Sequence, residues 1–373
     1  MKRRGFLSTT LKTSGVLAIG SLPAFNIISR KKLYKDRLGI ALVGLGSYAT
    51  NQLGPGLRFT KNCYLAGVVT GSPDKAEKFA IDYNLDDKSI YNYDNYEEIA
   101  NNPEIDMVYV AMPNNMHAEY TIRGLQAGKH AISEKPMSTT YAEGKRMTDA
   151  AAKTDKRLFV GYRLHFDPFH LEMMRLGQKQ VYGKVLETDA AFAFPLTDKK
   201  RWRLDKVMAG GGPMMDVGIY ALQGTIYTLG ELPTAVTAVE KTKDKAFYSD
   251  IEGTLEWSMK FPSGTKNILR TSYEDGYNYV KARAEQGEFS VEPAYSYNRL
   301  AGTTPAGPMV FPRVNQQALQ MDAIALSVMT KTPNPASGMM GLRDMFMIDK
   351  IYESMGTGKE VSLAGMPQVL DRM

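Results

Sequence analysis

Lys135, Asp216 and Tyr220 are the residues of this sequence whose types best suit catalysis. Lys135 stands in Glu134-Lys135-Pro136, where the proline stiffens the turn. Asp216 and Tyr220 are four residues apart, so a helix would present both on one face. A cation beside a tyrosine stabilises its phenolate, and such a tyrosine can accept a hydroxyl proton while a hydride leaves the same carbon. Taken singly, Tyr220 is better explained as a half-buried helix tyrosine and Asp216 as a carboxylate at a helix start.

A dinucleotide-binding pattern follows the apolar run Leu38 to Val43 and reads Gly44-Leu45-Gly46-Ser47-Tyr48-Ala49. Gly44 permits a tight turn, and Gly46 lets the backbone approach a pyrophosphate. Ala49 fills the third position, where Gly or Ala is accepted. The strand before this pattern and the helix after it favour a site for a nicotinamide dinucleotide.

The end of the second apolar run, Tyr64 to Val69, bears on the choice between NAD and NADP. NAD-specific sites usually place Asp or Glu at this strand tip for the ribose hydroxyls. Here Thr70, Ser72 and Lys75 follow, with no carboxylate at the tip. Two hydroxyls, a helix N-terminus capped by Ser72 and a lysine can hold a 2′-phosphate. The segment favours NADP and leaves NAD open, since an ordinary capped helix with a solvated lysine has the same sequence.

Apolar runs and helical segments alternate through the first half of the chain. The remaining expected elements are strands Met107–Met112, His130–Ser133 and Leu158–Gly161 and helices from Ser72, at Thr121–Ala127 and at Tyr141–Ala152. This alternation predicts a doubly wound parallel sheet, and ligands of such sheets bind beyond the carboxyl ends of the strands. The segments expected to meet there begin at Gly44, Thr70, Pro113 and Lys135.

The second half predicts a different kind of sheet. Residues Ile251 to Phe261 alternate with a period of two, which places Glu252 on the polar side of a half-covered strand. The triplet Gly210-Gly211-Gly212 predicts a flexible start to a helix. The further expected elements are strands Asn267–Glu274, Tyr277–Ala284 and Glu288–Glu292 and helices Met214–Leu229, Gln316–Met329 and Leu342–Ser354. The predicted fold is α/β, with a Rossmann domain at 36–162 followed by an α+β domain with a large, mostly antiparallel open sheet at 163–373.

The first thirty residues, 1–30, have the layout of a twin-arginine export leader. Lys2-Arg3-Arg4-Gly5-Phe6-Leu7 precedes the apolar stretch Val16–Phe25, which is too short and too rich in Gly and Ser to span a bilayer as a stable helix. We therefore expect a protein that folds around its cofactor and is exported already loaded to the periplasm. No Ala-x-Ala cleavage site is present, so removal of the leader and its retention as a membrane anchor both stay open.

Charge, hydropathy, cysteine and histidine content indicate which ligands and structural features are not expected. Much of the net charge of +6 comes from basic residues before the first strand, so nucleic acid is not implied. No later apolar run reaches ~18 residues, so we expect no internal membrane span. The single cysteine, Cys63, cannot form an internal disulfide. His165 and His170 lack partners at metal-ligand spacing, so we expect no metal.

The motifs together resemble those of a known family. The supporting segments are Pro113-Asn114-Asn115-Met116-His117, Ala127-Gly128-Lys129-His130, Gly161-Tyr162-Arg163, Trp202-Arg203-Leu204, Gln320-Met321-Asp322 and Gly341-Leu342-Arg343-Asp344. With the residues above, they make the sequence from Leu38 onward similar to the glucose-fructose oxidoreductase/inositol dehydrogenase (Gfo/Idh/MocA) family. The leader, and Tyr220 where most members carry His, resemble the periplasmic glucose-fructose oxidoreductase branch most.

The resemblance implies an NADP-dependent oxidoreductase acting on CH–OH groups of small-molecule sugars, in a homo-oligomer (dimer or tetramer) that associates through the open sheet. It implies that Lys135 orients the reacting hydroxyl, Asp216 positions the sugar and Tyr220 is the acid and base. The cofactor-binding residues expected from motif and resemblance together are Gly44, Gly46, Ser47, Tyr48, Thr70, Ser72, Lys75, Pro113, Asn114, His117, Glu134, Lys135, Arg163, Trp202 and Arg203.

Two other functions stay open. One is a glycosidase that uses the bound nicotinamide for transient oxidation, and the other is a cofactor-loaded sugar-binding protein without catalysis. A pure binding protein has no need of Lys135, Asp216 and Tyr220 together, which favours an enzyme. If the cofactor cannot leave, one sugar must reduce it and a second reoxidise it, so the kinetics should be ping-pong. The sequence does not set which sugars these are.

Overall fold

The structure, a computed structural model, describes residues 35–198 and 201–370. From Lys35 onward these residues belong to one compact unit. The expected leader at 1–30 lies outside the described residues.

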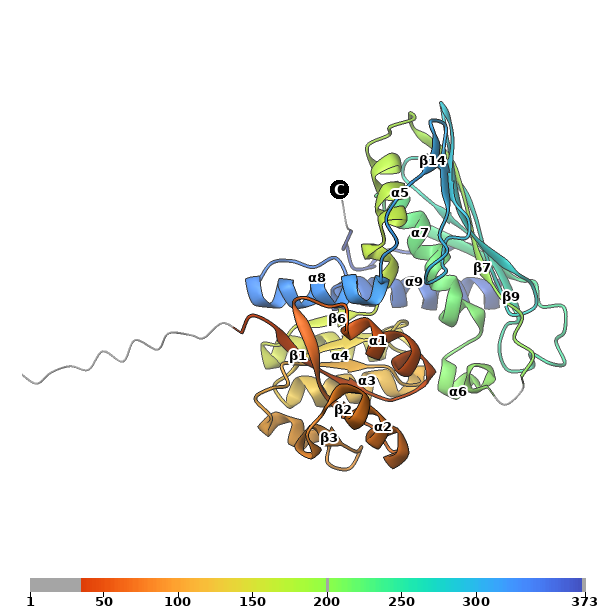
Figure 1. Cartoon of the computed structure of the whole chain (residues 1–373). Helices are drawn as coiled ribbons and strands as arrows, with labels where there is room; N and C mark the ends of the chain where they lie inside the picture. Colours follow the sequence, from red (N-terminus) through yellow and green to blue (C-terminus); the bar gives the residue numbers. More distant parts are fainter. Residues whose placement is uncertain (1–34, 199–200, 371–373) are drawn as a thin grey trace, which may run out of the picture. The chain divides into compact units, whose positions relative to one another are not determined.

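In the described part of the chain, six parallel strands form the first sheet, in the order β3-β2-β1-β4-β5-β6 (Figure 1). Their bounds are β1 (Leu38–Val43), β2 (Cys63–Val69), β3 (Ile90–Tyr91), β4 (Met107–Val110), β5 (His130–Ser133) and β6 (Leu158–Val160). This is the strand order of a Rossmann fold, and it confirms the predicted parallel sheet. The order reverses at β1, so the crevice for a ligand lies where the glycine pattern follows that strand.

Two of the helices that connect these strands start at or next to the predicted positions. Their bounds are the π-helical turn η1 (Ala49–Leu53), α1 (Gly54–Leu57), α2 (Pro73–Tyr83), α3 (Asn114–Gln126) and α4 (Tyr141–Thr154), with short 3₁₀ turns η2 (Asp87–Ser89) and η3 (Tyr96–Asn101). The Thr140 side chain accepts a hydrogen bond from the Glu143 backbone N–H, which fixes the start of α4. Helix α3 begins at Asn114, earlier than predicted, so His117 lies near its N-terminus rather than before it.

The second sheet contains nine of the described strands, in the order β14-β13-β12-β11-β7-β10-β9-β8-β15. Their bounds are β7 (Val185–Ala193), β8 (Ala235–Glu240), β9 (Thr254–Lys260), β10 (Lys266–Ser272), β11 (Tyr277–Ala284), β12 (Gly287–Val291), β13 (Gly302–Thr304), β14 (Gly307–Met309) and β15 (Val361–Ser362). Strands β7 and β10 pair in parallel, and the other pairs that these strands form are antiparallel. The prediction of a large, mostly antiparallel sheet is confirmed.

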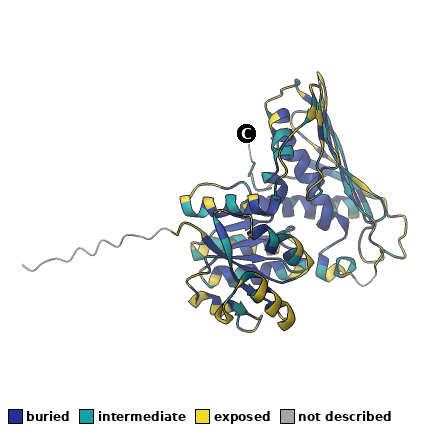
Figure 2. Cartoon of the chain, in the orientation of Figure 1, coloured by how far each residue is buried: buried dark blue, intermediate teal, exposed yellow. Residues whose placement is uncertain are grey.

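Helices cover one face of the second sheet (Figure 1). The helices and turns of this half are η4 (Arg163–Phe166), α5 (Pro168–Gln178), η5 (Trp202–Leu204), α6 (Lys206–Ala209), the π-helical turn η6 (Met214–Gly218), α7 (Ile219–Leu229), α8 (Gln316–Thr330) and α9 (Gly338–Thr357). Helix α7 is buried along almost its whole length, as the dark blue in Figure 2 shows. This burial explains why its sequence is apolar on all sides. Among the described residues, no helix is both long and apolar enough to cross a membrane.

Helix α8 comes from the second half of the chain but packs on the first sheet. Met321 and Ile324 belong to the same buried cluster as Ile40 and Leu42 of β1. The carboxylate of Asp322 accepts hydrogen bonds from the backbone N–H groups at 61 and 62, at distances between 2.7 and 2.9 Å. These contacts tie the Rossmann sheet to the later part of the chain and hold the two walls of the crevice in place.

Candidate active site

A cavity of about 780 Å³ lies beyond the carboxyl ends of the first sheet's strands and extends to the second sheet. Its lining includes the predicted site residues Gly46, Ser47, Tyr48, Pro113, Asn114, His117, Glu134, Lys135, Arg163, Trp202, Arg203, Asp216 and Tyr220. Four predicted residues do not line it, namely Gly44, Thr70, Ser72 and Lys75. The candidate catalytic residues and most of the candidate cofactor residues therefore share one cavity.

The glycine pattern after β1 forms a cradle that fits a dinucleotide. Gly44 has a φ of +89°, and a Cβ there would lie 2.7 Å from the Ala111 carbonyl oxygen, so only glycine suits this turn. A Cβ built on Gly46 would meet nothing within 4 Å and would occupy open space at the cavity. The backbone at Gly46 is thus free to approach a bound phosphate, as a nicotinamide dinucleotide requires.

The three residues expected to choose the cofactor lie at the end of β2. Thr70 is buried, and its hydroxyl accepts a hydrogen bond of 3.2 Å from the Ser72 backbone N–H. Ser72 stands at the N-cap of α2 as predicted, but its side chain makes no capping hydrogen bond. Lys75 is exposed in the first turn of the same helix. The Ser72 hydroxyl and the Lys75 amine are therefore not committed to the helix.

Lys135 follows β5 and reaches across to the second half of the chain. Its Nζ donates a hydrogen bond of 2.5 Å to the Asp216 carbonyl oxygen and lies 3.3 Å from Asp216 Oδ1. The same Nζ lies 4.9 Å from the centre of the Tyr220 ring. The structure thus brings together the three residues that the sequence singled out for catalysis.

Both carboxylate oxygens of Asp216 have partners. Arg203 Nε donates to Oδ2 at 2.9 Å, and the Tyr273 hydroxyl donates to the same oxygen at 3.1 Å. Burial would raise the pKa of Asp216, but the positive charges of Lys135 and Arg203 outweigh it and hold this pKa below its usual value. Asp216 is therefore an ionised group that fixes the positions of Lys135 and Arg203. The partner Tyr273 was missed because it follows β10 in a segment without a motif.

The Tyr220 ring is held by aromatic packing and flanked by two cations. Its centre lies 5.6 Å from that of Phe192 and 5.8 Å from that of Tyr295. Besides the Lys135 ammonium, the Arg163 guanidinium lies 5.1 Å from the ring centre. This geometry restricts the ring while its side chain lines the cavity. Sequence reasoning did not find Phe192 and Tyr295, because sheet pairing alone brings them to the site.

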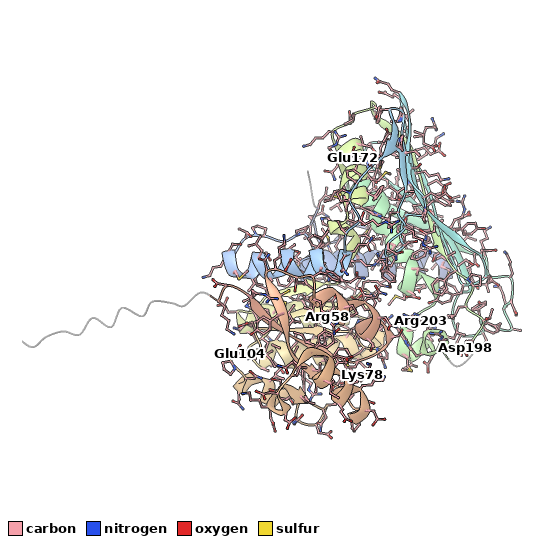
Figure 3. All side chains as sticks on the ribbon, viewed as in Figure 1. Arg58, Lys78, Glu104, Glu172, Asp198 and Arg203 are labelled. Carbon is pink, nitrogen blue, oxygen red and sulfur yellow. The ribbon has the colours of Figure 1, made fainter. Side chains whose placement is uncertain are left out.

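Arg203 and Trp202 belong to the turn η5, which leads into α6; Figure 3 labels Arg203. The Arg203 guanidinium lies 4.6 Å from the centre of the Trp202 ring. The Asp205 side chain accepts hydrogen bonds from the backbone N–H groups of Val207 and Met208 and so fixes the start of α6. Trp202 therefore presents an aromatic surface at the cavity, of the kind that stacks on the apolar face of a sugar ring.

Glu134 is a buried carboxylate next to Lys135. It accepts hydrogen bonds from the Tyr109 hydroxyl at 2.7 Å and from the Lys135 backbone N–H at 3.1 Å. Burial raises the pKa of Glu134. Gly161 makes room for it, because a Cβ there would stand 2.5 Å from Glu134 Oε1. Tyr109 of β4 and Gly161, which follows β6, thus enclose Glu134 from the two strands on either side of β5.

His117 holds backbone rather than facing a reacting group. Its Nδ1 lies 2.8 Å from the Pro136 carbonyl oxygen and its Nε2 lies 2.8 Å from the Met112 carbonyl oxygen. Burial lowers the pKa of His117 to about 4, although the two carbonyl contacts favour the protonated ring. It links the loops that follow β4 and β5 and supports the position of Lys135.

The glycine triplet before Asp216 is tightly packed, which corrects the prediction of a flexible segment. A Cβ on Gly211 would lie 2.1 Å from the Tyr352 hydroxyl, and one on Gly212 would lie 2.1 Å from the Glu252 carbonyl oxygen. The Glu252 carboxylate accepts hydrogen bonds from the backbone N–H groups of Gly212 and Met214, at 3.0 and 3.1 Å. The prediction of Glu252 on the polar face of a strand was wrong, because β9 begins only at Thr254. The start of η6 is therefore fixed by close packing of the glycines, not by a flexible backbone.

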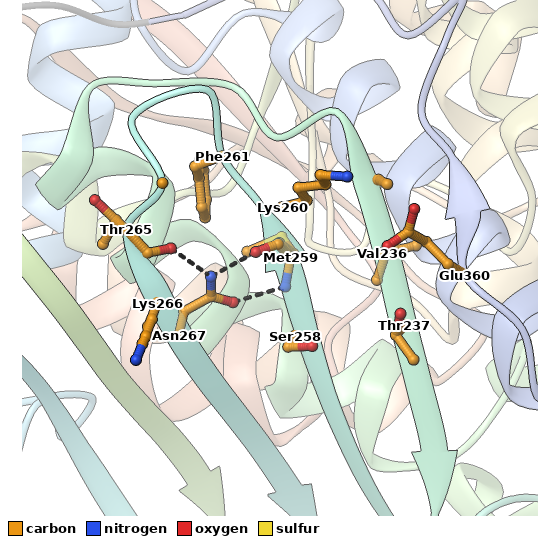
Figure 4. A pocket seen from close by; sticks show the side chains of 12 residues that line it. Val236, Thr237, Ser258, Met259, Lys260, Phe261, Thr265, Lys266, Asn267 and Glu360 are labelled. Carbon is orange, nitrogen blue, oxygen red and sulfur yellow. Dashed lines mark hydrogen bonds between the residues drawn. The ribbon is translucent and has the colours of Figure 1, made fainter.

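Other candidate groups lie away from the cavity. His165 is buried, with its ring centre 4.6 Å from that of Tyr227. A second cavity, of about 450 Å³, lies against β8, β9 and β10 (Figure 4), where Asn267 pairs with the backbone of Met259. That cavity contains none of the predicted site residues. Within the part of the chain that the structure describes, no three His, Cys, Asp or Glu side chains are grouped so that they could hold a metal ion.

Comparisons with known proteins agree with this architecture. Residues 38–162 match an oxidoreductase family described by its NAD-binding Rossmann fold, and residues 170–292 match the GFO/IDH/MocA C-terminal domain. The crystal structure of aldose-aldose oxidoreductase from Caulobacter crescentus in complex with glycerol superposes with a TM-score of 0.85. It is 33% identical in sequence, and the match covers 88% of this chain and 100% of that chain.

Two curated proteins extend the comparison. D-xylose 1-dehydrogenase [NADP(+)] from Haloarcula marismortui is 26% identical, over 87% of this chain and 92% of its own. A dTDP-3,4-didehydro-2,6-dideoxy-alpha-D-glucose 3-reductase from Saccharopolyspora spinosa is 30% identical, over 69% of this chain and 75% of its own. Fold and site thus define an oxidoreductase that depends on NAD(P). The chain belongs to the glucose-fructose oxidoreductase/inositol dehydrogenase (Gfo/Idh/MocA) family, as the sequence resemblance predicted.

Proposed function

We propose that the protein is a periplasmic sugar oxidoreductase that keeps NADP(H) bound and transfers hydride at a sugar CH–OH carbon. The observation that carries the proposal is the single cavity shared by the Gly46 cradle and by Lys135, Asp216 and Tyr220. Similarity to an aldose-aldose oxidoreductase and to a xylose dehydrogenase supports sugars as substrates. The anomeric carbon of a pyranose is the preferred site of oxidation, and it yields a lactone.

The residues divide the work of proton transfer. When bound, the nicotinamide accepts and returns the hydride. The Tyr220 hydroxyl oxygen takes the proton of the sugar hydroxyl during oxidation and gives it back during reduction. Lys135 Nζ, held by Asp216, donates a hydrogen bond to the same sugar oxygen and orients it. Lys135 and Arg163, both near the Tyr220 ring, stabilise the phenolate that must be present before oxidation and that forms again after reduction.

NADP is the proposed cofactor because of the end of β2. Thr70, Ser72 and Lys75 offer two hydroxyls and an amine beside a helix N-terminus, and no carboxylate stands at the strand tip to hold ribose hydroxyls. The NADP(+) named for the Haloarcula marismortui relative supports the same choice. NAD is the alternative that the binding experiment must exclude.

The proposed location and reaction order rest on the export leader expected at 1–30. A periplasmic enzyme has little free nicotinamide cofactor available, so a bound cofactor has to be recycled in place. We therefore propose ping-pong kinetics in which a donor sugar reduces the cofactor and leaves before an acceptor aldose or ketose reoxidises it, as in the glucose-fructose oxidoreductase branch. We also propose a dimer or tetramer that associates through the open face of the second sheet.

Cofactor content and steady-state kinetics test this function. Protein purified without added cofactor should release stoichiometric NADP(H) on denaturation, identified by mass, and double-reciprocal plots without free NADP should give parallel lines. Cofactor-free protein that binds NAD and NADP equally and weakly, or intersecting lines with an absolute need for added NADP, would contradict it. Release of sugar from a glycoside without net redox change would favour the glycosidase instead.

A further inference from the structure

Tyr297 reaches from the second half of the chain to the glycine loop of the first. It lies between β12 and β13, and its ring centre is 6.3 Å from that of Tyr48, with an angle of 35° between the ring planes. Tyr48 comes two residues after Gly46, and both tyrosines line the cavity. The two rings therefore join the opposite walls of the crevice next to the place where a pyrophosphate would lie.

Arg163 holds the Tyr297 ring and the backbone before it in place. Its guanidinium lies 4.5 Å from the centre of the Tyr297 ring. The same group donates hydrogen bonds to the backbone carbonyls of Tyr295, at 2.6 Å, and Ser296, at 3.4 Å. Arg163 itself is only 2% exposed, so ring and backbone are fixed to a rigid point.

Burial shows that Tyr297 is not a core residue. Its side chain is 42% exposed, whereas Tyr295, two residues earlier, is 1% exposed and fills the core. A partly exposed aromatic ring at the rim of a cavity adds little to the stability of the fold. Its position suits contact with a molecule inside the cavity.

We propose that Tyr48 and Tyr297 form a clasp that closes over the bound nicotinamide dinucleotide and slows its release. This inference rests on the proposed function, because only an enzyme that recycles its cofactor needs to retain it through two half-reactions. The clasp stands at the nucleotide loop, whereas Trp202 lines the part of the cavity near Arg203. Sugars can then exchange while the cofactor stays.

The dissociation rate of NADPH tests the clasp directly. Protein loaded with NADPH is mixed with a large excess of NADP⁺, and the loss of energy transfer from protein aromatics to bound NADPH gives the rate. Tyr297→Ala loses a ring contact and a cation–π contact and should release NADPH on the order of tenfold to a hundredfold faster. Tyr297→Phe keeps the ring and should stay close to wild type.

Two further comparisons separate a clasp from a general effect on folding. Phe59→Ala, which removes a 67% exposed aromatic ring outside the cavity lining, should leave the release rate and the activity unchanged. The double variant of Tyr48→Ala with Tyr297→Ala should be little faster than either single variant, because both remove the same contact. Unfolding temperatures of the cofactor-free proteins should be alike.

The outcomes distinguish this inference from the proposed function. If wild type and Tyr297→Ala both retain NADPH equally well, the clasp is overturned and the proposed function still stands. Wild type that releases NADPH as fast as Tyr297→Ala overturns both the clasp and the retained cofactor. Additive effects of the Tyr48 and Tyr297 substitutions also overturn the clasp, since they would show two independent contacts.

Discussion

Tyr220→Phe is the substitution that most sharply separates chemistry from packing. It removes one hydroxyl and keeps the ring, which Phe192 and Tyr295 hold on two sides. The fold and the bound cofactor should therefore be unaffected. Loss of a positioned acid and base costs on the order of 10²–10⁴-fold in rate, or about 3–5 kcal/mol of transition-state stabilisation.

Lys135 should behave as part of the same unit. Its Nζ lies 4.9 Å from the Tyr220 ring centre, so Lys135→Met removes the charge that supports the tyrosine and the donor that orients the sugar. We expect a loss similar to that of Tyr220→Phe. The double variant should be little worse than either single one, because residues that act as a unit are strongly non-additive.

Single-turnover hydride transfer is the assay for these variants. Protein loaded with NADP⁺ is mixed rapidly with donor sugar, and the absorbance of reduced nicotinamide is followed. Tyr227→Phe is the matched control, since it makes the same change on the same helix, at a hydroxyl that contacts Met340 and does not line the cavity. Hydride transfer within a few-fold of wild type in Tyr220→Phe would refute the assignment. The base would then have to be Lys135 or Glu134, because His165 packs away from the cavity.

Three other substitutions test the surrounding structure. Lys75→Ala should weaken NADP binding on the order of tenfold and leave NAD binding unchanged, as titration with each cofactor would show. Asp216→Asn leaves the cations of Lys135 and Arg203 without their counter-charge and should cost about 3 kcal/mol of stability at neutral pH. Because the folded-state pKa of Asp216 is lowered, its contribution is present above the ordinary value of 3.8 and is lost as pH falls through the lower folded value, so wild type and variant should converge in thermal unfolding in acid. Glu252→Ala orphans two buried N–H groups, at about 1–3 kcal/mol each, and should lower both the unfolding temperature and kcat.

Local sequence was enough to predict the Rossmann sheet and the centre of the site. The apolar runs that precede Gly44, Thr70 and Lys135 predicted the strands. Because ligands of a parallel sheet bind beyond the carboxyl ends of its strands, the loops that follow were expected to lie together. Strand β3 was missed because a two-residue strand has no hydrophobic period. The start of α3 was predicted late because Asn114 to Glu119 is polar, although its backbone is helical.

The partners that tune the site could not be predicted in this way. Pairing between strands that are distant in sequence brings Phe192 and Tyr295 to the cavity and Tyr273 to Asp216, and no local pattern encodes that register. Glu252 was placed on the wrong side because alternation was extended past the true start of β9. The Glu252 carboxylate is close to the glycine triplet in space but distant in sequence, so a single sequence contains no pattern that predicts their contact.

In the proposed reaction, a sugar reduces a cofactor that never leaves the protein. The most direct measurement is the absorbance of purified, extensively dialysed protein in the reduced-nicotinamide band, before and after addition of a donor aldose and then of an acceptor sugar. We predict a stoichiometric rise with the donor alone and a return to the starting value with the acceptor, without any cofactor added. Absence of any change until free NADP is supplied, followed by continuous accumulation of free NADPH, would contradict it.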